Sequence, residues 1–242
     1  MGRPAIAPRR EAPLRSDTVL VRRLLLYTDP PFEGSGVSLR RAVTAALPDV
    51  PLLHNHVDGP RVPLVRYSAR QGIAELTGIG EGVPLLDQVR GALTFLVVGS
   101  RSYRIQGAEL FDERLPFGVV DHAVTHRFIT PWLALNERNH VRYQSSGPQE
   151  RQRLLEAILV GNLLSLSKAV GHHEERRIAV RVEQLVPIVC HHKGVKMLGF
   201  RGSFAANFAI PSALGVGKLT SKGFGKVETV PRFTDTEELC NF

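Results

Sequence analysis

The first half of the chain shows apolar runs and helical spacings in a strand-helix-strand-strand-helix-strand order. Apolar runs bounded by Pro, Asp and Gly predict strands, and apolar residues three or four positions apart predict helices. Ser38 is expected to cap the first helix. The predicted elements are a strand at 18–28, a helix at 38–47, strands at 62–69 and 72–76, a helix at 84–93 and extended chain at 92–110. This order is typical of a ferredoxin-like domain.

The second half contains one long helix that begins at Pro148 and ends at Gly171. Its apolar positions are 154, 155, 158, 159, 163, 164 and 166. Strands are predicted within 124–136, 178–189, 195–210 and 225–230. We therefore expect an α+β protein in which a second, less regular domain follows the ferredoxin-like one. The expected division is a flexible basic N-terminal extension at 1–17, an N-terminal domain at 18–120 and a C-terminal domain at 121–242.

Basic residues outnumber acidic ones, and one segment carries much of the excess. The 242 residues include 31 Lys and Arg against 23 Asp and Glu, a formal net charge of +8. Between Glu183 and Glu228 no acidic residue occurs. The lysines and arginines of this interval are Lys193, Lys196, Arg201, Lys218, Lys222 and Lys226. Such a region is expected to attract a polyanion such as a nucleic acid; the alternative is that the charge serves solubility alone.

Cysteine content and hydropathy indicate the compartment. The two cysteines, Cys190 and Cys240, are too few for a disulfide framework, and no secretory signal opens the sequence. We therefore expect a protein of the reducing cytoplasm. The apolar stretch 157–166 is too short to span a membrane, so no transmembrane segment is expected.

Two histidines, His54 and His56, stand two residues apart in the run PLLHNHVDGP. If this run is extended, both side chains project to one face, because side chains alternate along a strand. Near neutral pH one imidazole can hold a proton while the other lacks it, which is the condition for combined acid and base catalysis. Removal of a proton from a ribose 2′-hydroxyl and donation of one to a 5′-leaving oxygen is such a task. The alternative is a pair of ordinary polar histidines in a loop.

A metal site is not expected. Metal-dependent DNA nucleases spread the residues of their HNH motif over a ββα unit, which the compact tripeptide here does not match. The other paired histidines lack partners at zinc spacing. His122 and His126 are four residues apart, but their segment is predicted to be extended, so we expect them at the surface or at an interface.

A glycine-rich segment, GVGKLTSKGFGKV at 215–227, carries the stronger motif. Glycines allow positive φ and let backbone N–H groups approach phosphate oxygens, and lysines supply positive charge. A Walker A loop would open a helix, whereas this segment leads into a predicted strand, so nucleoside triphosphate binding is disfavoured. An RNA backbone is the expected ligand; the alternative is a hairpin whose glycines serve only its turns.

These motifs resemble a known family. The chain resembles the CRISPR-associated endoribonucleases of the repeat-associated mysterious protein superfamily, in the branch with a histidine pair. Four motifs carry the resemblance: HNH after the first helix, PLVRY, FITPWLALNERN and GVGKLTSKGFGKVET. The resemblance extends from about 18 to 230. It implies tandem ferredoxin-like (RRM-like) domains and cleavage of precursor CRISPR RNA within the repeat. It further implies no metal or other cofactor, and products with 2′,3′-cyclic phosphate and 5′-hydroxyl ends.

The resemblance also assigns residues and partners. It makes His54 and His56 jointly the base and the acid, and Tyr67 a residue that orients the scissile phosphate or stacks on a base. RNA contacts are implied for Arg40, Arg41, Arg66, Gly215, Gly217, Lys218, Lys222, Gly223, Gly225 and Lys226. The implied partners are CRISPR repeat RNA, other CRISPR-associated proteins and a second copy of the chain, with no membrane. The alternative function is a non-catalytic CRISPR RNA-binding subunit of an interference complex.

Overall fold

The computed structural model describes residues 17–50, 53, 63–192 and 194–231. The extension predicted at 1–17 lies outside these residues except for Asp17. The strands are β1 (Asp17–Asp29), β2 (Val65–Arg70), β3 (Ile73–Ile79), β4 (Phe95–Val98), β5 (Arg101–Trp132), β6 (Val180–His192), β7 (Val195–Ala209) and β8 (Val227–Thr229). The helices are α1 (Gly36–Ala46), α3 (Val83–Ala92), α4 (Glu137–Ser145) and α5 (Pro148–Ala169), with 3₁₀ turns η1 (Gly80–Gly82) and η2 (Thr220–Lys222). In the described part of the chain, no helix is both long and apolar enough to cross a membrane.

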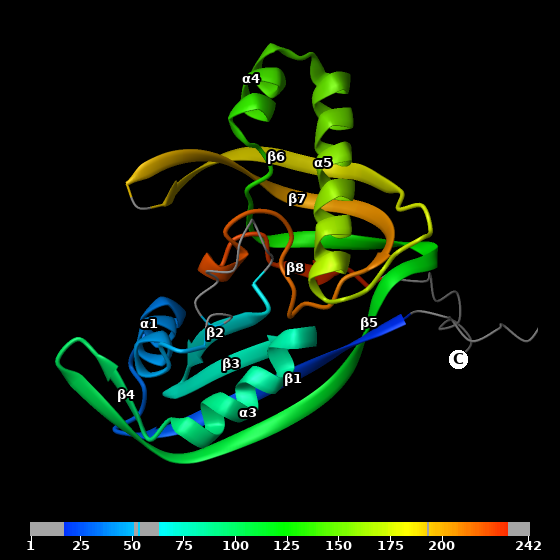
Figure 1. Ribbon diagram of the computed structural model, residues 1–242. Helices are drawn as coiled ribbons and strands as arrows, with labels where there is room; N and C mark the ends of the chain where they lie inside the picture. Colours follow the sequence, from blue (N-terminus) through cyan, green and yellow to red (C-terminus); the bar gives the residue numbers. More distant parts are fainter. Residues whose placement is uncertain (1–16, 51–52, 54–62, 193, 232–242) are drawn as a thin grey trace, which may run out of the picture.

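The first half has the predicted ferredoxin-like arrangement. Its strands pair in the order β2-β3-β1-β5, all antiparallel, and the hairpin strand β4 also pairs with β5. Helices α1 and α3 cover one face of this sheet (Figure 1). They bury an apolar layer that includes Leu39 and Leu86 on the helices and Leu24, Leu26 and Leu76 on the strands. The other face of the sheet is thereby left to the second half of the chain.

Two local details differ from the sequence prediction. Helix α1 begins earlier, because Ser35 rather than Ser38 is the N-cap. Ser38 takes the third helical position and completes a capping box: its amide donates to Ser35 Oγ (3.2 Å), and its Oγ accepts from the Ser35 amide (2.7 Å). The second predicted strand of this pair was expected to begin at Gly72, but Gly72 belongs to the turn. Gln71 and Gly72, both at positive φ, make the two-residue turn of the hairpin between β2 and β3.

The second half repeats the same strand order without the second helix. Strands β6, β7, β5 and β8 lie side by side in that order, and α5 connects β5 to β6. Helix α5 packs along this sheet (Figure 1) and buries Leu154, Leu155, Leu159, Leu163 and Leu166. The predicted apolar position Leu164 is instead 40% exposed. Where a ferredoxin-like fold has its second helix, the connection between β7 and β8 holds the glycine-rich segment and η2, which is the irregularity that the sequence predicted.

Strand β5 joins the two halves. It pairs with β1 as far as Phe117 and with β7 from Gly118 onward. Gly118 has a φ of 98°, and this left-handed residue marks the change of partner. The predicted domain division after residue 120 therefore falls inside one continuous strand, and it stays a prediction of domain organisation.

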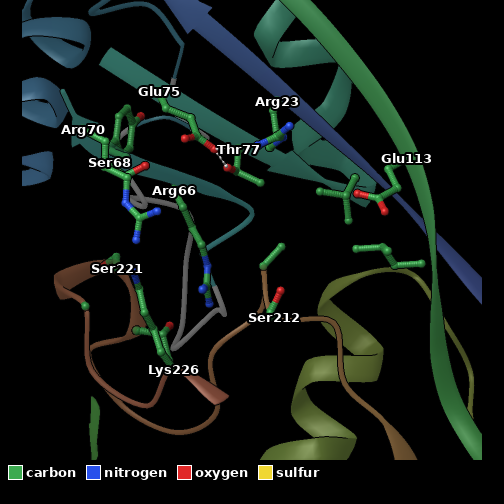
Figure 2. A pocket seen from close by; sticks show the side chains of 16 residues that line it. Arg23, Arg66, Ser68, Arg70, Glu75, Thr77, Glu113, Ser212, Ser221 and Lys226 are labelled. Carbon is green, nitrogen blue, oxygen red and sulfur yellow. Dashed lines mark hydrogen bonds and ion pairs between the residues drawn. The ribbon is translucent and has the colours of Figure 1, made fainter. Parts of the chain in front are cut away.

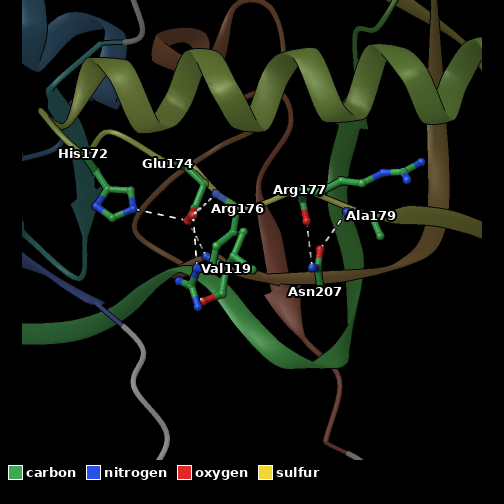
Figure 3. A network of polar contacts seen from close by, with 7 residues as sticks. All are labelled: Val119, His172, Glu174, Arg176, Arg177, Ala179 and Asn207. Carbon is green, nitrogen blue, oxygen red and sulfur yellow. Dashed lines mark hydrogen bonds and ion pairs between the residues drawn. The ribbon is translucent and has the colours of Figure 1, made fainter.

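A buried carboxylate holds this junction (Figure 3). The Glu174 side chain is only 3% exposed. Its Oε2 accepts from the Val119 amide (2.8 Å) and from His172 Nε2 (3.3 Å), and its Oε1 accepts from the Arg176 amide (3.0 Å) and Nε (3.2 Å). Burial alone would raise the pKa of the carboxyl, but these hydrogen bonds outweigh burial and hold it below its ordinary value of 4.5.

We expect Glu174→Gln to lower the free energy of unfolding at neutral pH by about 1–3 kcal/mol, because buried donors lose their acceptor. A carboxyl whose folded-state pKa is lowered stabilises the fold above its ordinary pKa, and that contribution is lost as pH falls through the folded value. The difference between wild type and variant should therefore shrink in acid. Urea denaturation at several pH values measures this, with the exposed neighbour Glu175→Gln as control. A difference that does not change with pH would contradict the assignment.

His126 is not at a surface, so the prediction for it was wrong. It is 0% exposed, and its ring lies 5.3 Å from the ring of Phe204. At this point β5 is paired on both sides, with Phe204 of β7 and Thr229 of β8 as the register partners of His126. Its Nε2 lies 2.8 Å from the Phe208 carbonyl oxygen, which can only accept, so Nε2 carries the hydrogen. Burial lowers the pKa of His126, so the ring is a neutral core group. His122 is exposed, as predicted.

Candidate nucleic-acid interface

A cleft lies between the first-half sheet and the glycine-rich segment. It has a cavity volume of about 520 Å³. One wall is the sheet face opposite α1 and α3, and the other wall is formed by the glycine-rich segment and the residues just before it (Figure 2). The charged and hydroxyl-bearing residues that line it are Arg23, Arg66, Tyr67, Ser68, Arg70, Glu75, Thr77, Glu113, Ser212, Thr220, Ser221 and Lys226. Basic groups therefore outnumber acidic ones in the lining.

Alternation along β2 directs its polar side chains into this cleft. Arg66, Ser68 and Arg70 are two residues apart and share the face toward the glycine-rich segment. Val65 and Tyr67 point to the opposite face and pack in the core beneath α1 and α3. The pattern R-x-S-x-R was visible in the sequence, so a period-two analysis of this strand would have found Ser68 and Arg70, which the sequence prediction missed.

Arg66 is the most deeply buried basic side chain of the cleft. Its residue is half-buried overall, but Nε and Nη2 are shielded from solvent and have no hydrogen-bond partner among the described residues. Burial lowers the pKa of the guanidinium to about 10. The group therefore still carries its charge at neutral pH.

Tyr67 lies on the helix side of β2, away from Arg66. Its Oη donates to the Leu53 carbonyl oxygen over 3.5 Å. Burial raises the pKa of Tyr67 to about 12, and the positive charge of Arg40 on α1 opposes that rise. Arg40 and Tyr67 are thus neighbours beside Leu53, a residue that is 1% exposed. His54 and His56 follow Leu53 in the sequence and lie outside the described residues.

The glycine-rich segment is fixed to the end of β5 and to the chain that follows it. Lys218 Nζ donates to the Leu135 carbonyl oxygen (2.8 Å), and burial lowers the pKa of this ammonium. The Gly225 amide donates to the Pro131 carbonyl oxygen (2.8 Å). A Cβ on Gly217 would lie 2.5 Å from Nε1 of the buried Trp132, so the segment packs directly on the indole ring. These contacts give the segment a defined shape.

The predicted RNA-binding residues divide into groups. Gly223 and Lys226 line the cleft with Arg66, and Gly215 lies against Arg66. Arg40 lies beside Tyr67, and Arg41 is exposed on α1. The remaining predicted residues of the segment, which do not line the cleft, are Gly217, Lys218, Lys222 and Gly225.

The turn at Gly225 gives a direct test of the segment's shape. Gly225 has a φ of 65°, and a Cβ there would lie 2.0 Å from the Val216 carbonyl oxygen. We expect Gly225→Ala to destabilise the protein by at least about 3 kcal/mol, because strain and overlap add. Gly223 also has positive φ (90°) but open space around it, so Gly223→Ala should cost only about 1–2 kcal/mol. Urea denaturation of the two variants measures this; equal losses would contradict the turn geometry.

Asn136, in the segment LALNERN, has a structural role. It is the N-cap of α4, and its side-chain oxygen accepts a hydrogen bond from the Asn139 amide (2.7 Å).

Within the described ranges, no cluster of three or more His, Cys, Asp and Glu side chains is arranged to hold a metal ion.

Both halves of the chain match models of one protein family. The Cas6b N-terminal domain matches residues 20–115, and the Cas6b C-terminal domain matches residues 118–230. A solved crystal structure of Cas6b is 30% identical with a TM-score of 0.72, covering 88% of this chain and 100% of that chain. Another, of the CRISPR RNA processing endoribonuclease Cas6b, is 27% identical with a TM-score of 0.63 and the same coverage. The uncharacterized protein MJ0978 of Methanocaldococcus jannaschii is 42% identical over 111 residues, which are 46% of this chain and 76% of the relative.

Proposed function

Because the chain belongs to the Cas6b family, we propose that it is an endoribonuclease that processes CRISPR RNA. The observation that carries the proposal is the match of both halves, in order, to the two domains of this family. A similar structure that covers 88% of the chain is a CRISPR RNA processing endoribonuclease. The substrate is then CRISPR repeat RNA, and the basic cleft between the two halves supports binding of its phosphate backbone.

For the chemistry we propose His54 and His56 as general base and general acid. One imidazole removes the proton of a ribose 2′-hydroxyl, and the 2′-oxygen forms a bond to the adjacent phosphorus. The bond from phosphorus to the 5′-oxygen breaks, and the other imidazole gives that oxygen a proton. The products are a 2′,3′-cyclic phosphate and a 5′-hydroxyl, and the net proton count is unchanged. Histidine suits both steps because its ordinary pKa lies near neutral pH.

The surroundings of Leu53 support a catalytic role for the residues that follow it. Leu53 is buried, and its carbonyl oxygen accepts from Tyr67 Oη, so the chain is anchored one residue before His54. The charge of Arg40 acts on Tyr67 in this anchor, and we propose that it also attracts the phosphate that is attacked. We propose that Tyr67 acts as a positioning residue through this anchor.

Incubation of the full chain with labelled repeat RNA in excess EDTA tests the proposal. We expect one cut within the repeat, and none in an RNA of scrambled sequence, because the two imidazoles supply both proton transfers without a metal ion. RNA binding without a cut, both in EDTA and with added Mg²⁺, would favour the alternative, a non-catalytic RNA-binding subunit. A cut that requires added Mg²⁺ would contradict the metal-independent mechanism.

Family resemblance extends the proposal to assembly with other CRISPR-associated proteins and with a second copy of the chain. Size-exclusion chromatography with and without repeat RNA measures the second of these.

A further inference from the structure

Phe111 of β5 exposes an aromatic ring on the open face of the first-half sheet. Leu110 packs in the layer beneath α1 and α3, so Phe111, the next residue, points to the opposite face. Phe111 is 43% exposed. Over residues 106–117, β5 pairs only with β1 among the described strands, so Phe111 also lies at the margin of the sheet. The ring is therefore accessible to a ligand.

Arg23 of β1 lies over this ring. Arg23 and Phe111 are register partners, and the guanidinium carbon lies 5.8 Å from the centroid of the ring. The Arg23 side chain is itself 50% exposed, and its one ion pair among the described residues is a long contact with Glu75 (3.9 Å). Unpaired nucleobases stack both on aromatic rings and on guanidinium planes in RNA-binding proteins. The pair is therefore suited to a flat aromatic ligand.

Glu113 places a carboxylate beside this stacking surface. It follows Phe111 by two residues on the same face of β5, and it lines the cleft together with Arg23 (Figure 2). Glu113 is exposed, and its carboxylate takes part in no hydrogen bond or ion pair within the described part of the chain. Glu109, on the other side of Phe111, instead accepts from Tyr27 Oη (3.1 Å). The Glu113 carboxylate is thus available to a ligand that stacks on Phe111.

The charges around Phe111 favour a base over a phosphate. The carboxylates of Glu109 and Glu113 repel the phosphates of a nucleic acid. They can accept hydrogen bonds from a base, and an ionised carboxylate can only accept. Among the RNA bases, guanine alone presents two adjacent donors, N1–H and N2–H, on its Watson–Crick edge, and these match the two oxygens of one carboxylate. Adenine, cytosine and uracil each place an acceptor next to the donor on that edge.

We propose that Phe111, Arg23 and Glu113 form a nucleobase site that is specific for guanine. The base stacks on the Phe111 ring and the Arg23 guanidinium, and the Glu113 carboxylate accepts from N1–H and N2–H. The guanine belongs to an unpaired nucleotide of bound RNA, because Arg23 and Glu113 also line the cleft and so connect the two surfaces. For this ligand the site rests on the proposed function. It adds base specificity, which contacts to the RNA backbone do not provide.

Binding of short single-stranded RNA by the full chain tests the site. The probes are a labelled oligouridine and the same RNA with one central guanosine, inosine or adenosine, followed by fluorescence anisotropy. We expect the guanosine RNA to bind about tenfold more tightly than oligouridine, and the adenosine RNA to gain less, from stacking alone. Inosine keeps N1–H but lacks the 2-amino group, so its gain should lie between these two. Equal affinity for guanosine RNA and oligouridine, or no binding of either, would overturn the proposal and leave the surface to another ligand, such as a basic protein segment.

Glu113→Gln separates base recognition from charge. The variant removes a negative charge, so its affinity for oligouridine should not fall. Its preference for guanosine should be lost, because the glutamine amide presents one acceptor and one donor group in place of two acceptors. Glu150→Gln is the matched control, since Glu150 is an exposed carboxylate on α5, and it should keep the preference. A guanosine preference retained in Glu113→Gln would contradict the assignment.

Phe111→Leu tests the stacking. Leucine keeps an apolar side chain but removes the aromatic ring, so binding of the guanosine RNA should weaken about tenfold. The dependence of affinity on salt should stay unchanged, because no phosphate contact is lost. Phe95→Leu on β4 is the control, since Phe95 is 51% exposed, and it should bind like wild type. An equal loss in Phe95→Leu, or full affinity in Phe111→Leu, would count against the site.

Cleavage does not enter these measurements, so the site and the proposed function can fail separately. A protein that prefers guanosine RNA but leaves repeat RNA uncut would refute the proposed function and support the site. A protein that cuts repeat RNA but shows no preference for guanosine would support the proposed function and refute the site.

Discussion

Replacement of His54 or His56 by alanine is expected to slow cleavage of repeat RNA by about 10²–10⁴-fold, because each variant loses one proton transfer. RNA affinity should change little, since we propose that other residues make the phosphate contacts. Single-turnover cleavage with enzyme in excess separates the two effects. The rate of the wild type should also be bell-shaped in pH, because one imidazole must be neutral and the other protonated.

Exposed histidines elsewhere provide the control for this experiment. His122 on β5 and His173 after α5 are exposed, so His122→Ala and His173→Ala should cleave like wild type. If His54→Ala and His56→Ala also retained the full rate, the histidine pair would have no catalytic role. A flat pH profile in the wild type would argue against the pair in the same way.

Trp132→Ala is expected to cause the largest loss of stability among the substitutions considered, about 3–5 kcal/mol. Trp132 is fully buried and stacks on Phe128, with ring centroids 5.3 Å apart. Its Nε1 donates to Asn162 Oδ1 (3.1 Å), and its indole supports Gly217. The substitution therefore opens a cavity in the second-half core and removes the surface on which the glycine-rich segment packs. Binding of repeat RNA should weaken as a consequence.

Urea denaturation followed by circular dichroism measures this loss. Val141→Ala is the control, because Val141 of α4 is 68% exposed and its truncation should change stability by less than about 0.5 kcal/mol. An unfolding midpoint of Trp132→Ala equal to that of wild type would contradict the described packing.

The regular parts of the fold could be predicted because their residues carry a periodic signal. Apolar residues three and four positions apart define α5, and the structure buries five of them in the second-half core. The first half follows the ferredoxin-like order because each strand and helix has its own bounded apolar run. The cap at Ser35 was missed because two nearby serines, Ser35 and Ser38, both suit a helix start, and the choice between them depends on the entering chain.

The parts that could not be predicted depend on contacts between distant residues. Nothing in the sequence around His126 shows that β7 and β8 would enclose it on both sides. Arg66 on β2 lies against Gly215 of the glycine-rich segment. No local sequence pattern connects these two distant parts of the chain. Lys218 was expected to face RNA, and only the fold shows that its ammonium donates to the Leu135 carbonyl oxygen.

Cleavage of a repeat RNA that carries a single 2′-deoxy substitution at the cut site tests the central claim most directly. The account predicts that wild type in excess EDTA cuts the all-ribose RNA to 2′,3′-cyclic phosphate and 5′-hydroxyl ends, binds the deoxy RNA with similar affinity, and leaves it uncut. Cleavage of the deoxy RNA at the same position would contradict the account, because the attacking 2′-oxygen is absent from that substrate.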